Sequence, residues 1–270
     1  MMYIDLHKAI AQVPKSDRKK LQDATCKLGA STPDERRTQL ANGSAIWRGA
    51  KEALQKTSSG KCWYTESRNP GFINTIDHFR PRQRYPQSGP CQYWYWWLGF
   101  ELTNFRVSCR AANSGTTDPA TAIVGGKGTH FPLDSGCSHA KIDCQIKQEK
   151  ALLLDPCCEV DTTLLQFNPD GRPAIRADKA SDPALQHRVT ESVRLLSIDF
   201  SAINEDRERL YNSIKVDIDL GDALAGNTAA LAKIQARFLD YMSRRSPYSK
   251  AAECYIRMFR SRPWIDTLFG

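Results

Sequence analysis

Four short pieces between residues 61 and 133 decide how this chain is expected to fold: KCWYTES (61–67), NTIDHFRPRQRYP (74–86), YWYWWLGFELTNFRVSCRAANS (93–114) and GGKGTHFPL (125–133). The second piece places an aspartate beside a histidine at the end of a strand-like run. The third places an asparagine on each side of another short strand-like run. Carboxylate and amide oxygens around a histidine can hold one divalent cation next to a general base. The four pieces therefore predict a metal-dependent hydrolytic site.

The role of each candidate residue follows from its chemistry. Asp77 offers a carboxylate oxygen and Asn113 an amide oxygen, the hard ligands that suit Mg²⁺ or Mn²⁺. His78 is expected to take a proton from water, because an unperturbed pKa of roughly 6.5 makes imidazole competent near neutral pH. Asn104 is expected to hold the imidazole through an oxygen and so fix its tautomer. An isolated Asp–His pair is usually an ordinary surface or core pair, so the interpretation depends on the combination.

Basic residues next to this site are candidates for substrate binding. Hydrolysis of a phosphodiester needs an activated water, an electrophilic clamp on the phosphate and stabilisation of the leaving oxygen, and one hard cation can supply the last two. Arg80 and Arg82 follow the histidine and are expected to clamp phosphate oxygens. Lys127 or His130 could add to this clamp.

The composition is that of a globular protein with a basic excess. The chain has 270 residues, of which 41% are hydrophobic and 25% charged, and its net charge is +8. Such a charge favours encounter with polyanions, although from charge alone a basic protein without a nucleic-acid role is equally compatible. No apolar run reaches the roughly 18 residues of a membrane span, and the first residues lack the apolar segment of a secretory signal. We therefore expect a cytoplasmic protein without a membrane partner.

Helical and strand signals flank and fill the central region. Residues 31–57 are expected to be helical, with Thr32 as the N-cap and a possible break at Gly43. Residues 61–64 and 72–79 favour strands. The aromatic block at 93–97 favours core packing over a base-stacking platform. Elements further along the chain are expected as a buried strand at 149–154, a hairpin turn at 167–172, two helices separated near 197–200, and helices at 222–242 and 250–259.

Several short motifs follow one another in the order found in a known protein family. DHFRP is followed by WL and N, by SC-x-x-x-N, by KG-x-x-FPL, by LLLDPC and by F-x-x-x-G. This order resembles the HNH endonucleases of bacterial anti-phage systems, above all the Septu-type and retron-associated HNH effectors. The resemblance runs from about residue 60 to 172, and more loosely through the helices beyond.

The resemblance implies an α+β fold with a small ββα-metal (HNH) core at 60–175, between an N-terminal helical arm at 1–59 and a C-terminal helical region at 176–270. It implies a single divalent cation and a nuclease that works with an ABC-type ATPase, together with a retron RNA–DNA in the retron-associated systems. The C-terminal region is the candidate docking surface for that partner. The substrate in such systems is DNA or transfer RNA, and the sequence does not distinguish them.

By matching motif, the resemblance makes His78 the general base, Asp77 and Asn113 metal ligands, and Asn104 the middle asparagine. The last HNH position is asparagine here instead of histidine, which is compatible with a cation that prefers oxygen ligands.

The chain departs from the family at a structural zinc site. Many relatives carry two C-x-x-C pairs, whereas here Cys62 is paired with Thr65 and Cys109 with Ala112. Tetrahedral structural zinc generally needs four Cys or His ligands, so structural zinc is not expected. Four other residues could supply the missing ligands: Cys91, Cys137, His139 and Cys144.

Two other classes of function are open. One is a catalytically silent nucleic-acid-binding or assembly subunit that keeps the HNH fold, and the other is a basic protein whose cysteines bind zinc for structure alone. The presence of Asp77, His78 and Asn113 together favours the nuclease, because a decayed site would be expected to lose its base or a ligand. The missing thiolates count against the zinc protein.

Overall fold

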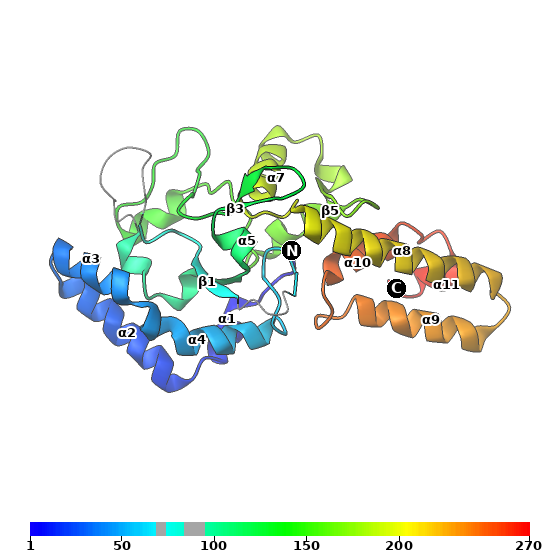
Figure 1. Cartoon of the computed structure of the whole chain (residues 1–270), viewed down its shortest axis with the longest axis horizontal. Coiled ribbons are helices and arrows are strands. Elements are labelled where there is room, and N and C mark those ends of the chain that lie inside the picture. The colour runs from blue at the N-terminus through cyan, green and yellow to red at the C-terminus, as the bar shows by residue number, and fades with distance from the viewer. Residues whose placement is uncertain (69–73, 84–94) are drawn as a thin grey trace.

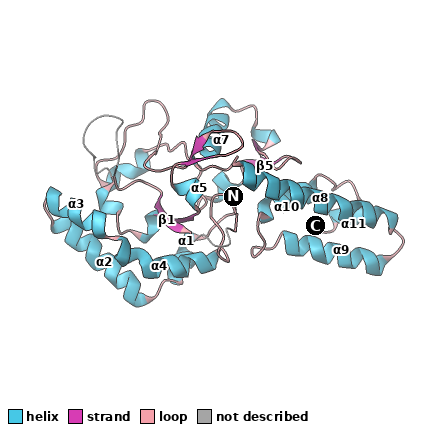
Figure 2. Ribbon diagram, in the orientation of Figure 1, coloured by secondary structure: helices cyan, strands magenta, loops and turns pink. Residues whose placement is uncertain are grey.

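The computed structural model describes residues 1–68, 74–83 and 95–270. Figure 1 shows the N-terminal helices at one end of the molecule and the helices after residue 200 at the other, with the short strands between them. Figure 2 shows that helices and loops make up most of the chain and that the strands are short. No helix within the described ranges has the length and apolar character needed to cross a bilayer.

The N-terminal part is a group of four helices: α1 (Leu6–Ala11), α2 (Lys15–Ala30), α3 (Pro33–Asn42) and α4 (Ser44–Thr57). The predicted N-cap at Thr32 is confirmed, since its side chain accepts from the backbone of Glu35 and the Glu35 side chain accepts in return. The predicted break at Gly43 is also confirmed. A side chain at Gly43 would approach the ring of Phe100 to 2.6 Å, so the turn between α3 and α4 packs too closely for one.

The central strands form an antiparallel pair. β1 (Thr75–His78) pairs with β2 (Phe105–Ser108), with His78 opposite Phe105, and the helix α5 (Arg110–Asn113) follows directly. The strand expected over 72–79 is therefore confirmed for 75–78, while residues 69–73 lie outside the described part. The strand expected at 61–64 is wrong, because this segment is a turn: the backbone nitrogen of Cys62 donates to the carbonyl of Ser67, and that of Trp63 donates to the carbonyl of Val107 in β2.

Two further antiparallel pairs are β3 (Thr116–Thr117) with β4 (Val124–Gly125), and β5 (Leu165–Phe167) with β6 (Pro173–Ile175). The second pair confirms the expected hairpin turn. Its Gly171 has a φ of +79°, and a Cβ there would lie 2.0 Å from the carbonyl oxygen of Asn204, so glycine is required.

The strand predicted at 149–154 is wrong. Only one isolated bridge forms there, between Leu133 and Ala151. Two backbone bonds reach a neighbouring loop, from Leu152 to the carbonyl of Pro132 and from Asp134 to the carbonyl of Lys150. Side chains of the helix α7 (Pro183–Leu195) supply others: Arg188 donates to the carbonyl of Ala151, and Ser192 bonds with Leu152 and Leu154. An apolar run can thus be buried without a continuous strand ladder when a loop and polar side chains of a helix satisfy its backbone.

The C-terminal region is helical, as predicted. The break near 197–200 separates α7 from α8 (Ser201–Ala223), and the helix expected from 222 begins later because Asn227 caps it. The remaining helices and 3₁₀ turns are α6 (Glu159–Thr162), α9 (Thr228–Tyr241), α10 (Ser249–Arg257), α11 (Pro263–Asp266), η1 (Trp96–Leu98), η2 (Leu102–Asn104), η3 (Asp143–Gln148) and η4 (Ala177–Lys179).

Two apolar clusters meet at the central strands. One joins α1–α4 to Ile76, Phe105 and Val107, and the other joins Cys62 and Cys109 to the C-terminal helices. Of the aromatic block, Tyr93 and Trp94 lie outside the described part, whereas Tyr95 is fully buried against other aromatic rings. The strands that carry the candidate site are therefore fixed from both ends of the molecule.

Candidate functional site

The structure brings four of the predicted site residues to one place. Asp77 and His78 of β1 and Asn113 of α5 line a single pocket of about 340 Å³. Arg82 lines the same pocket, as does Gly128 of the loop after β4. The antiparallel pairing of β1 with β2 and the immediate turn into α5 place the end of this helix beside the start of β1.

Both carboxylate oxygens of Asp77 are hydrogen-bonded. The side chain is 3% exposed; its Oδ2 accepts from the hydroxyl of Tyr64 at 2.6 Å and its Oδ1 accepts from Nζ of Lys127 at 2.8 Å. Burial and the neighbouring Asp77 charge raise the pKa of Tyr64 well above its usual range, so the phenol keeps its proton and donates it. The side chain of Asp77 thus lies between a phenol and an ammonium group, each of which donates to one of its oxygens.

His78 is held in one tautomer. Its Nε2 lies 2.9 Å from the carbonyl oxygen of Gly99. Because a carbonyl oxygen can only accept, Nε2 carries the proton and Nδ1 carries the lone pair. The ring packs edge-on against Trp47 and Phe105, with centroid distances of 5.1 and 5.2 Å. Burial, with a contribution from the charge of Arg82, lowers the pKa of His78 to about 4. The imidazole is therefore neutral near pH 7, with Nδ1 able to accept a proton.

Asn104 has a different role from the predicted one. Its Oδ1 accepts from the backbone nitrogen of Arg80 at 2.8 Å, and its Nδ2 donates to the carbonyls of Arg80 at 2.9 Å and Leu98 at 3.3 Å. The prediction that Asn104 fixes the tautomer of the imidazole is corrected, because the carbonyl of Gly99 makes that contact. Asn104 instead positions the backbone just after His78.

Asn113 is oriented by the strand beside it. Its Nδ2 donates to Oγ1 of Thr75 at 2.8 Å. Within the described ranges its Oδ1 accepts no hydrogen bond from the protein. The amide oxygen is therefore available in a half-buried position on the wall of the pocket.

Two of the four predicted phosphate contacts are committed elsewhere. Arg80 bonds to Oε2 of the buried Glu149 at 2.7 Å and stacks over Phe131, outside the pocket of Asp77. Lys127 is fully buried, so the expectation that it contacts substrate is corrected: it serves an internal carboxylate. Both side chains neutralise buried acids, and no pattern in the sequence predicts these two ion pairs.

Of the other two predicted phosphate contacts, one lines the pocket and one does not. Arg82 lines the pocket and donates to the carbonyl of Leu40 at 2.6 Å. His130 is exposed and does not line this pocket.

The four positions of the zinc-binding pairs also meet in the structure. Thr65 Oγ1 lies 3.8 Å from the sulfur of Cys109, and Cys62 bonds to both. Burial opposes ionisation of Cys62, but hydrogen bonds from Cys109 and Thr65 outweigh it and lower the pKa of Cys62 to about 6. Ala112, the fourth position, lies in the same buried cluster.

None of the substitute ligands joins this cluster among the described residues. Cys91 lies outside the described part, and His139 bonds instead to the hydroxyl of Tyr95 at 2.8 Å. Over residues 1–68, 74–83 and 95–270, no three Cys, His, Asp or Glu side chains are grouped as metal ligands.

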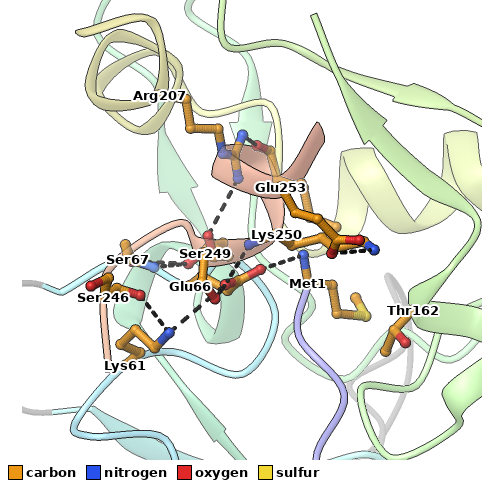
Figure 3. Close-up of polar contacts among 12 residues, drawn as sticks. Met1, Lys61, Glu66, Ser67, Thr162, Arg207, Ser246, Ser249, Lys250 and Glu253 are labelled. Carbon is orange, nitrogen blue, oxygen red and sulfur yellow. Dashed lines mark hydrogen bonds and ion pairs between the residues drawn. The ribbon is translucent and has the colours of Figure 1, made fainter. Parts of the chain in front are cut away.

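The loop that carries Tyr64 is anchored to the C-terminal helices by a buried acid (Figure 3). Glu66 contacts the amino group of Met1 at 3.1 Å and the hydroxyl of Ser249 at 2.8 Å, and lies 3.8 Å from Nζ of Lys61. Burial works against the charge of Glu66, but these cations lower its pKa to about 2. The donor to Asp77 is therefore fixed by contacts that reach α10.

The donor atoms of the pocket suit a hard divalent cation, although the carboxylate among them already contacts an ammonium group. Asp77 and Asn113 supply carboxylate and amide oxygens on the same pocket wall, the ligand types of Mg²⁺ and Mn²⁺. A cation bound there would share the carboxylate with the ammonium group of Lys127.

Three residues of the site were not predicted. Tyr64, Gly99 and Thr75 each bond to a candidate catalytic or ligand side chain. Gly99 acts through its carbonyl, which no side-chain pattern can reveal. Tyr64 lies in a β-prone run and suggests apolar packing, and its spacing from Asp77 carries no signal of a contact.

Comparison with known proteins gives one relative. No protein-family model matches the chain, and no solved structure matches it. The curated Septu protein PtuB of Bacillus mycoides (strain KBAB4) is 30% identical over 170 residues, which cover 62% of this chain and 52% of the relative. The matched segment thus spans about half the length of that relative. The chain is similar to a Septu protein, and this similarity supports a place in the Septu group of defence proteins.

Proposed function

We propose that this chain is a metal-dependent HNH endonuclease, which hydrolyses phosphodiester bonds of nucleic acid as the effector of a Septu-type anti-phage system. The observation that carries the proposal is the pocket shared by Asp77, His78 and Asn113, in which the imidazole has its lone pair on Nδ1. The similarity to the Septu protein PtuB and the order of the sequence motifs support the same function.

In this mechanism His78 takes a proton from the attacking water at Nδ1. The bond from Nε2 to the carbonyl of Gly99 holds the ring, and burial keeps the imidazole neutral and ready to accept a proton. Asp77 and Asn113 would hold a divalent cation, which when bound polarises the phosphate and stabilises the leaving oxygen. Arg82, on the wall of the pocket, adds positive charge where the phosphate would lie.

The proposed partners are a nucleic acid, either DNA or transfer RNA, and an ABC-type ATPase, with a retron RNA–DNA as a further partner in the retron-associated form. They come from the family resemblance. The helices after residue 176 are the proposed docking surface for the ATPase, because they lie outside the pocket of Asp77.

One observation favours a second candidate, a catalytically silent subunit that retains the fold. Both oxygens of Asp77 already have donors inside the protein, and one of those donors is a cation. A carboxylate bound in this way can serve structure alone.

Cleavage assays distinguish the two candidates. The full chain, alone and with the ATPase, is incubated with supercoiled plasmid or transfer RNA in Mg²⁺ or Mn²⁺. His78→Ala should reduce cleavage by about two to four orders of magnitude, the usual contribution of a general base. His7→Ala is the matched control, because this exposed histidine of α1 does not line the pocket.

The assay can refute the proposal in two ways. Wild-type cleavage by His78→Ala would show that this imidazole is not the base. No cleavage by the wild type, even with the ATPase and both nucleic acids, would favour the silent subunit.

A further inference from the structure

Lys127 is presented by a loop that is tied to α5. Its backbone nitrogen donates to the carbonyl of Ala112 at 2.9 Å, and Gly128 donates to the carbonyl of Asn113 at 2.8 Å. Gly126 and Gly128 on either side have φ of +96° and +52°, and a Cβ at Gly126 would lie 2.0 Å from a backbone oxygen. These glycines allow the turn that brings Lys127 under β1.

The side chain of Lys127 crosses from this loop to β1. Its Nζ is buried and donates to Oδ1 of Asp77 at 2.8 Å and to the carbonyl of His78 at 2.7 Å. A carboxylate that is 3% exposed needs a compensating charge, because burial of an unpaired charge is unfavourable. Lys127 supplies that charge.

We propose that Lys127 determines how tightly the Asp77–Asn113 site binds a divalent cation, because its ammonium group already neutralises the carboxylate that the cation would use. The inference rests on the proposed function and concerns the affinity of the same site. Two cations on one buried carboxylate repel each other strongly, since the interior screens charge poorly. The site with Lys127 in place therefore binds a divalent cation weakly.

The second donor to Asp77 does not have this effect. Tyr64 is neutral and bonds to Oδ2, so it orients the carboxylate without opposing a second cation. Charge, and not occupancy of an oxygen by a hydrogen bond, is what distinguishes the two partners. This difference provides a matched pair of variants.

Binding of Mn²⁺ to the full chain, followed by electron paramagnetic resonance without nucleic acid, measures the affinity directly. Lys127→Met and Lys127→Gln should each bind Mn²⁺ at least about tenfold more tightly than the wild type, and Mn²⁺ should raise their melting temperatures more. Tyr64→Phe should change the affinity by less than about threefold, because it removes a hydrogen bond and no charge. Asp77→Asn, introduced into the Lys127→Met variant, should abolish the increase in Mn²⁺ affinity.

Equal or weaker Mn²⁺ binding by the folded Lys127 variants would overturn the inference. Lys127→Gln retains hydrogen-bond donors and covers the case in which Lys127→Met does not fold. The measurement needs no cleavage, so the two proposals can fail separately. Tighter Mn²⁺ binding without cleavage by any preparation would refute the nuclease and leave the role of Lys127 intact.

Discussion

Asn104 offers a quantitative test of how the site is built. Its side chain is 4% exposed and makes three hydrogen bonds, two with the backbone of Arg80 and one with the carbonyl of Leu98. Asn104→Ala removes all three and leaves buried backbone groups without these partners. Each such group costs about 1–3 kcal/mol, so loss of the two bonds to Arg80 alone predicts a decrease of about 2–6 kcal/mol in the free energy of unfolding, and the bond to Leu98, long at 3.3 Å, adds less.

Urea unfolding, followed by circular dichroism, measures this loss. Asn42→Ala is the control, since Asn42 is exposed at the end of α3 and the change should stay within about 0.5 kcal/mol. A loss below about 1 kcal/mol for Asn104→Ala would show that these hydrogen bonds do not hold the segment after β1.

The same variant separates the observed role of Asn104 from the predicted one. Because the imidazole of His78 bonds to the carbonyl of Gly99, the Nε2-protonated tautomer should persist in Asn104→Ala. Nitrogen-15 NMR of the histidine side chains reports the tautomer. Loss of the Nε2–H form in a folded Asn104→Ala would mean that the asparagine does fix the imidazole.

Three further predictions follow from the buried groups. The double variant Thr65→Cys with Ala112→Cys should bind one zinc ion per chain, because the two new thiolates complete a set of four with Cys62 and Cys109. Elemental analysis measures the zinc content, and absence of zinc would show that the four positions do not converge. Between pH 7 and pH 5 the wild type should lose about 2 kcal/mol of stability relative to His78→Gln. The unfolded imidazole takes up a proton below its ordinary pKa of about 6.5, while the folded one, with a pKa of about 4, does not. Denaturant titrations that give the two proteins the same pH dependence would contradict this. Arg80→Gln should lower the free energy of unfolding by about 2–3 kcal/mol, because Glu149 loses its ion pair. The same variant should leave the salt dependence of nucleic-acid binding unchanged. A weaker dependence of binding on salt concentration would mean that Arg80 does contact phosphate.

Local patterns in the sequence predicted the helices well, because caps and breaks are local. The Thr32 N-cap, the break at Gly43 and the separation of α7 from α8 follow from side chains within a few residues of each boundary. The strand at 149–154 was wrong because its partner was not local. The sequence shows an apolar run, but whether a strand or the side chains of Arg188 and Ser192 satisfy its backbone depends on distant packing.

For the site, the sequence indicated that Asp77, His78 and Asn113 would lie together but not what each of them contacts, and it grouped with them Asn104, Arg80, Lys127 and His130, which do not line the pocket. Asp77 and His78 are adjacent and Asn113 follows the next strand, so the pairing of β1 with β2 is enough to bring them together. The contacts to Lys127 and Gly99 depend on a loop and on a backbone carbonyl. Neither has a fixed spacing from the residue it contacts.

Asp77 and His78 at the end of β1 show that adjacent residues of a strand can have different surroundings and still line one pocket. Successive side chains of a strand point to opposite faces, so Asp77 and His78 face different surroundings. Asp77 meets Tyr64 and Lys127, whereas His78 lies among Trp47, Phe105 and the carbonyl of Gly99. An acid and a base can then share a pocket while each keeps its own electrostatic environment: Asp77 lies against an ammonium group and a phenol, and the imidazole of His78 is held neutral by apolar burial. For the proposed general base this neutrality is what proton acceptance needs, whereas for the proposed cation ligand the ammonium group of Lys127 lowers the affinity.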